Sequence, residues 1–131
     1  MRFHHIGIAT ENIEEMIIHL NKILEISEIS DMIFDPLQNA NLCMLNLSGG
    51  VQIELISGEV VAGLIKKRNY LYHTCYSVDN IEESIKSLQD EGYLLISEPK
   101  KAILFEGERV AFLSGKLGII EILEENNSLS G

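Results

Sequence analysis

The feature that most constrains the fold of this 131-residue chain is an internal repeat. HIGIATENIEEMIIHL at 5–20 and HTCYSVDNIEESIKSL at 73–88 share seven identities in sixteen positions, and both stretches begin with histidine. A second agreement follows, in which VQIELI at 51–56 corresponds to GIIEIL at 118–123. Spacings of 68 and 67 residues are too long for one turn of a solenoid, so they predict a duplicated module.

Each copy predicts the same order of secondary-structure elements. It begins with a short β-rich stretch, FHHIGIA at 3–9 and YHTCYSV at 72–78. A helix is expected next, at 13–24 and 81–91, because an asparagine and a glutamate with capping-box spacing precede an apolar stripe. Gly92 is expected to end the second helix. Three extended segments should complete each copy, at 27–34, 40–47 and 51–57, and then at 93–97, 108–114 and 118–124.

This order predicts an α+β chain with two βαβββ modules rather than two separately folding domains. Within a single domain covering 1–131, we expect module one at about 3–57, a connecting helix at 59–67 and module two at about 70–124. Turns are expected at 48–50 and 114–116, and irregular links at 35–40 and 97–102.

A histidine and a glutamate in each module point to a metal site. Alternate residues of a strand share a face, so small residues accompany the histidines in HIGIA and HTCYS. Glu54 and Glu121 are single carboxylates inside hydrophobic strands, where an unpaired charge is costly. A lone strand histidine is usually structural and a lone carboxylate is usually on a solvated face, but here both recur at matching positions. Mixed imidazole and carboxylate ligands suit a divalent first-row ion, so the predicted ligands are His5, Glu54, His73 and Glu121.

The remaining histidines and the cysteines are weaker candidates. His4 is expected on the opposite strand face from its neighbour, and His19 has no counterpart at Ser87, so both are predicted to be surface or packing residues. Cys75 is predicted to be a small hydrophobe that lines a hollow beside the histidine. Cys43 stays undecided at this stage.

Charge and composition narrow the choice of partners. A net charge of −10 argues against nucleic acid or an anionic membrane surface as the main partner. The clusters KKR at 66–68 and KK at 100–101 are typical of solvated surface, although they leave a phosphate-bearing substrate open. The chain has no apolar run of about 18 residues and no signal-peptide pattern, and its two cysteines lack metal-knuckle spacing. We therefore expect a cytoplasmic protein with reduced thiols.

Around the repeated histidines and glutamates, the chain resembles the vicinal-oxygen-chelate superfamily. This superfamily includes glyoxalase I, methylmalonyl-CoA epimerase, extradiol dioxygenases and bleomycin-resistance proteins. The likeness covers about 3–124 and is strongest to methylmalonyl-CoA epimerase and its glyoxalase-like relatives, through HHIGIAT, YHTCYSVDNIEESI, ERVAFL and GIIEILE. The resemblance implies that the two modules form a cupped mixed sheet around a metal site, with the helices outside. It also implies one divalent ion per site (Co, Mn, Ni or Zn), bound by the same four residues, and a homodimer whose site is built from both chains in some members.

The resemblance further implies removal of a proton next to a carbonyl through a metal-stabilised enolate, with Glu121 and Glu54 as catalytic carboxylates. The leading hypothesis is epimerisation of a 2-substituted acyl-CoA. The alternatives are a glyoxalase I-type lyase that isomerises a thiol–ketoaldehyde adduct, and a non-catalytic small-molecule-binding protein.

Several departures leave the substrate open. ISGEVVAGL, which includes the end of the Glu54 strand, lacks the acidic-Ser-Pro stretch of the epimerases, and Ser114-Gly115 stands where they tend to have His-Pro. Cys43 lies near the place where some epimerases have a carboxylate.

Overall fold

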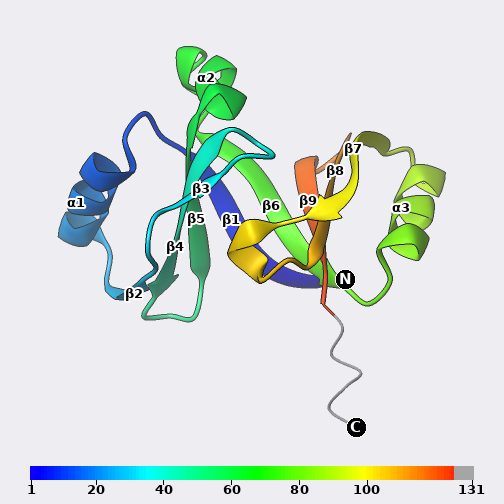
Figure 1. Cartoon of the computed structure of the whole chain (residues 1–131), viewed down its shortest axis with the longest axis horizontal. Coiled ribbons are helices and arrows are strands. Elements are labelled where there is room, and N and C mark those ends of the chain that lie inside the picture. The colour runs from blue at the N-terminus through cyan, green and yellow to red at the C-terminus, as the bar shows by residue number, and fades with distance from the viewer. Residues whose placement is uncertain (126–131) are drawn as a thin grey trace, which may run out of the picture. The chain divides into compact units, whose positions relative to one another are not determined.

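The computed structural model describes residues 1–125, which contain nine strands, three α-helices and one 3₁₀ turn (Figure 1). The chain divides into two compact units. The first unit is 5–72, and the second unit is 1–4 together with the chain from residue 73 onward. Each unit contains one copy of the repeat, which confirms the predicted α+β class and its two βαβββ modules. No helix of the described residues is long and apolar enough to cross a membrane.

The first unit contains a mixed sheet in the order β2-β4-β5-β1, with β3 also paired to β4. The β1–β5 pair is parallel, whereas β4 pairs antiparallel with β2, β3 and β5. The elements of this module are β1 (Arg2–Ala9), α1 (Ile13–Ile23), β2 (Ile26–Ile29), β3 (Ile33–Asp35), β4 (Ala40–Leu47), β5 (Gln52–Gly58) and α2 (Glu59–Lys66).

The expected single extended segment at 27–34 is in fact two strands. Both strands pair with β4, since Ile29 lies opposite Leu45 and Ile33 lies opposite Leu42. The segment from Ile29 to Ile33 advances by four residues, while the paired segment of β4, from Leu45 to Leu42, advances by three. The extra residue interrupts the pairing with β4 between β2 and β3.

The second unit contains the corresponding mixed sheet in the order β6-β9-β8-β7, in which β6 and β9 are parallel. Its elements are β6 (Leu71–Val78), α3 (Ile81–Asp90), β7 (Leu94–Lys101), the 3₁₀ turn η1 (Ile103–Phe105), β8 (Arg109–Gly115) and β9 (Gly118–Glu124). The first two residues of β6 belong to the first unit.

The prediction of an irregular link at 97–102 was wrong, because β7 continues to Lys101. Pro99 lies inside β7, where the pairing with β8 shifts register between Ser97 and Lys100. β7 ends the strand order of its unit, and proline is tolerated in an edge strand at a bulge because no ladder hydrogen bond is needed from it.

The predicted asparagine caps begin both helices. The backbone N–H of Glu15 donates to Asn12 Oδ1 (2.9 Å), and that of Glu83 donates to Asn80 Oδ1 (3.0 Å). Gly92, with φ +94°, follows the end of α3 as predicted, because glycine adopts this left-handed conformation without strain.

The two capped helices, α1 and α3, each cover one face of the sheet in their own unit. In the first unit, Ile13 of α1 packs with Cys43, Leu45 and Leu55 of β4 and β5. In the second unit, α3 packs on an apolar cluster from β6, β8 and β9 that contains Val78, Ala111, Leu113, Ile120 and Ile122. The histidines and glutamates of the repeat lie on the other face of each sheet, as the strand register below shows.

Candidate metal centre

The first unit brings His5 and Glu54 together as a buried pair. β1 and β5 run parallel with Gly7 opposite Glu54. His5 precedes Gly7 by two residues, so its side chain shares a face with that of Glu54. His5 Nε2 lies 3.4 Å from Glu54 Oε1, and the two residues are 0% and 4% exposed.

The second unit builds the same pair by the same register. β6 and β9 run parallel with Cys75 opposite Glu121, and His73 precedes Cys75 by two residues. His73 Nε2 lies 3.1 Å from Glu121 Oε1, and the two residues are 2% and 3% exposed. The sequence repeat is therefore a geometric repeat, in which parallel strands place a histidine beside a glutamate in each unit.

The donor chemistry of these side chains fits a divalent metal ion. A buried carboxylate needs a cation or a hydrogen-bond donor to offset its lost hydration. Two imidazoles and two carboxylates are ligand types that first-row divalent ions accept. His5, Glu54, His73 and Glu121 are all buried, and each offers an atom that could hold a metal ion.

Apolar side chains surround the pair in the second unit. Phe112 lies directly opposite Glu121 in the β8–β9 ladder. Its ring meets the His73 imidazole edge-on, with centroids 5.3 Å apart and an interplanar angle of 81°. Cys75 belongs to a buried cluster with Val110 and Leu123, which confirms that it packs as a small hydrophobe.

His19 lies away from these pairs, whereas His4 is a packing residue near Cys75: a ring nitrogen of His4 and the Cys75 sulfur lie within 4.8 Å of each other. The ring of His4 packs edge-on against Phe105, and its Nε2 lies 3.8 Å from a Glu125 carboxylate oxygen. His19 is exposed and lines a cavity of about 420 Å³ beside α1 that does not include His5 or Glu54.

Cys43, which the sequence left undecided, packs beneath α1. Its Sγ lies 3.4 Å from the backbone oxygen of Ser30. Burial raises the pKa of the Cys43 thiol, so the thiol form is favoured.

Sequence reasoning missed an ionic cluster in the second unit. Arg109 donates to Glu82 Oε2 (2.6 Å) and to Glu124 Oε1 (3.0 Å), and the Arg109 guanidinium lowers the pKa of the Glu82 carboxyl. Glu124 Oε2 also accepts the backbone N–H of Ile81 (3.0 Å) at the start of α3. This cluster connects α3, β8 and β9. Its members are far apart in sequence, so no local spacing signals it.

Comparison with protein families supplies the identity of the fold. Residues 4–112 match the model of the Glyoxalase/Bleomycin resistance protein/Dioxygenase superfamily. The chain belongs to this superfamily. The mitochondrial methylmalonyl-CoA epimerases of Bos taurus and Homo sapiens are both 27% identical to it, over 118 and 121 residues. These matches cover 86% and 88% of this chain, and 66% and 67% of the relatives, so the chain spans about two thirds of their length.

Solved structures of other proteins show the same fold. A hypothetical protein from Bacillus halodurans C-125 is 27% identical with a TM-score of 0.74, covering 95% of this chain and 94% of that chain. Methylmalonyl-CoA epimerase from Mycobacterium tuberculosis gives a TM-score of 0.80 at 20% identity, covering 98% and 91%. Glyoxalase I from Zea mays gives a TM-score of 0.69 at 18% identity, and the match covers 97% of this chain and 44% of that chain. At 20% and 18% identity the likeness is one of fold.

Proposed function

We propose that this chain is a divalent-metal-dependent enzyme that moves a proton on the carbon next to a carbonyl, and that it epimerises a 2-substituted acyl-CoA. The observation that carries the proposal is the pair of buried His–Glu contacts built by the same register in both units. The 27% identity to methylmalonyl-CoA epimerases supports the substrate class.

In this proposal the two pairs bind one ion together. A single His–Glu pair offers fewer ligands than the three protein ligands typical of catalytic zinc sites. Both pairs supply four, and the resulting set of His5, Glu54, His73 and Glu121 suits Co, Mn, Ni or Zn. A divalent ion bound there would supply positive charge where negative charge develops on the substrate's carbonyl oxygen.

The proposed catalytic residues are the two carboxylates. Glu121 would take the proton from the substrate carbon at a carboxylate oxygen, and His73, whose Nε2 lies 3.1 Å from Glu121 Oε1, would serve as the neighbouring metal ligand. Glu54 has the equivalent position in the first unit and would return a proton to the opposite face of the carbon. The apolar residues beside Glu121, including Phe112, would keep bulk water from this carboxylate.

The experiment that tests the proposal is exchange of the substrate's α-proton in heavy water, measured by NMR with metal-loaded Glu121→Gln. Glutamine keeps the shape and an oxygen ligand but cannot accept a proton at neutral pH. We expect metal to be retained and exchange to fall roughly a hundredfold or more. Glu54→Gln is the matched comparison. Because Glu54 returns the proton in this proposal, this variant should also be slow in epimerisation, and a mild effect would show that Glu121 is the only base. Near-normal exchange by Glu121→Gln with metal bound would show that the base lies elsewhere.

A glyoxalase I-type lyase is the second candidate, because the fold also matches Zea mays glyoxalase I and because Ser114-Gly115 replaces the His-Pro of the epimerase pattern. Product analysis with an acyl-CoA and with a thiol–ketoaldehyde adduct separates the two reactions. Binding without exchange or turnover would favour the non-catalytic alternative. The single domain, the homodimer and the cytoplasmic location stay predictions.

A further inference from the structure

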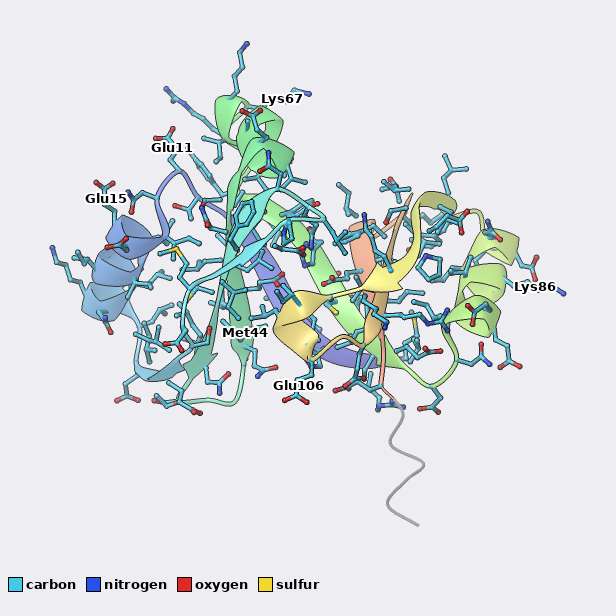
Figure 2. All side chains as sticks on the ribbon, viewed as in Figure 1. Glu11, Glu15, Met44, Lys67, Lys86 and Glu106 are labelled. Carbon is cyan, nitrogen blue, oxygen red and sulfur yellow. The ribbon has the colours of Figure 1, made fainter. Side chains whose placement is uncertain are left out.

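We propose that Met44 contacts the substituent of the small molecule that binds at the His5–Glu54 face, and thereby sets the size of substituent that the site accepts. This inference rests on the proposed function for the identity of the substrate. Figure 2 labels Met44 on β4.

Strand register places Met44 beside Glu54. The two residues lie directly opposite each other in the antiparallel β4–β5 ladder. Side chains at such positions point to the same face, with Cβ atoms about 4.5–5.5 Å apart. Glu54 shares this face with His5, so Met44 borders the candidate ligand pair. Cys43, its neighbour in the chain, points to the other face and packs beneath α1.

Burial distinguishes Met44 from the apolar residues around it. Leu42 and Ile56, which lie on the same face, are 3% and 1% exposed. Met44 is only half-buried, so part of its side chain remains accessible next to the buried carboxylate of Glu54. A molecule that approaches Glu54 from this side would therefore meet the thioether of Met44.

The backbone of Met44 is held in place independently of its side chain. Its N–H donates to Ser30 Oγ (2.8 Å), and its carbonyl oxygen accepts the N–H of Ser30 (2.9 Å). Substitution at position 44 should therefore change what borders Glu54 while leaving the path of β4 unchanged.

The equivalent position in the second unit carries a different side chain. Phe112 lies opposite Glu121, is 6% exposed, and packs edge-on against His73. A buried aromatic ring offers a fixed wall, whereas methionine has three rotatable bonds and a polarizable sulfur that fits irregular apolar groups. The two carboxylates thus have different surroundings. The adaptable methionine side chain beside Glu54 suits contact with a short alkyl substituent.

The chain makes a direct test practical, because it has four methionines: Met1, Met16, Met32 and Met44. Protein labelled with ¹³C at the methionine methyl groups and loaded with zinc would be titrated with methylmalonate and ethylmalonate. We expect the Met44 methyl resonance to move and that of the exposed Met32 to stay. A Met44 resonance that does not move at millimolar acid overturns the inference.

Substrate selectivity supplies the second measurement. One methylene in an apolar pocket typically changes kcat/KM by about tenfold or more. The ratio of kcat/KM for ethylmalonyl-CoA to that for methylmalonyl-CoA should rise about tenfold in Met44→Ala and fall about tenfold in Met44→Phe. Met32→Ala is the matched control and should leave the ratio unchanged.

The outcomes separate this inference from the proposed function. Unchanged ratios in both Met44 variants overturn the inference while leaving the epimerase proposal intact. No turnover of either thioester by the metal-loaded protein overturns the proposed function, and the methyl resonance then still decides whether Met44 borders the binding site.

Discussion

The stability of the second unit should depend on Glu124, a residue that sequence patterns alone do not single out. Glu124 Oε2 accepts the N–H of Ile81 at the first turn of α3, where backbone donors otherwise lack partners. The same carboxylate accepts hydrogen bonds from Arg109 Nε (3.0 Å) and from a terminal nitrogen of its guanidinium (3.1 Å). Glu124→Ala removes all of these contacts in one step.

The expected cost follows from these contacts. A hydrogen bond to a charged acceptor contributes about 1.5–3 kcal/mol, and removing it leaves the Ile81 N–H without this acceptor. The ion pair with Arg109 adds little to this, because the Arg109 side chain is 37% exposed and is screened by solvent. Glu124→Ala should therefore lower the free energy of unfolding by about 2–3 kcal/mol, or Tm by roughly 10 °C. Glu124→Gln keeps an acceptor oxygen without the charge and should cost about 1 kcal/mol.

Urea unfolding followed by circular dichroism, with a chelator present, measures these costs without a contribution from metal binding. Glu83→Gln is the matched control, because it removes an exposed charge from the same first turn of α3 and should cost only about 0.5 kcal/mol through the helix dipole. If Glu124→Ala costs no more than Glu83→Gln, the contact with Ile81 does not stabilise α3 and the reasoning is wrong.

Two further predictions concern other parts of the chain. Burial raises the pKa of Glu108, and neighbouring carboxylates raise it further. The protein therefore loses stability as pH rises through that pKa, because Glu108 then becomes charged in an unfavourable environment. Glu108→Gln should thus raise the free energy of unfolding at pH 7 by about 0.5 kcal/mol, a small value because the side chain is partly exposed, and the gain should vanish below the usual pKa of 4.5; an unchanged difference between pH 7 and pH 4 would contradict this. Ile85→Ala should lower the free energy of unfolding by about 2–4 kcal/mol in urea, because Ile85 is 9% exposed. Ile17→Ala, at the equivalent position of α1, should lower it less, because Ile17 is only half-buried. Equal losses would show that the two helices are packed alike.

The repeat made much of the fold predictable because it supplied each local signal twice. The capping asparagines and the apolar stripes fixed where α1 and α3 begin and which face they bury. Once strands are expected in both modules, alternation along β1 and β6 predicts that the histidines lie opposite the helices. In the structure both histidines are buried, and each one lies beside the glutamate of its own unit.

The remaining features depend on long-range pairing that local sequence does not encode. The split of 27–34 into β2 and β3 follows from one extra residue relative to β4, which becomes visible only when the partner strand is known. Pro99 favoured an irregular link, but the edge position of β7 tolerates it. The half-buried state of Met44 also depends on its neighbours, because its hydrophobic character alone would place it in the core.

The division of β1 between the units has a consequence for cutting the chain. Residues 1–4 belong to the second unit, where Arg2 pairs with Asp79 (3.1 Å) and Phe3 packs edge-on against Tyr76. Cleavage at the boundary between the repeats would therefore leave the later fragment without partners that the earlier fragment carries. The later fragment should therefore regain its full stability only when the earlier fragment is added, so this duplicated chain is suited to fragment complementation rather than to the isolation of the second module.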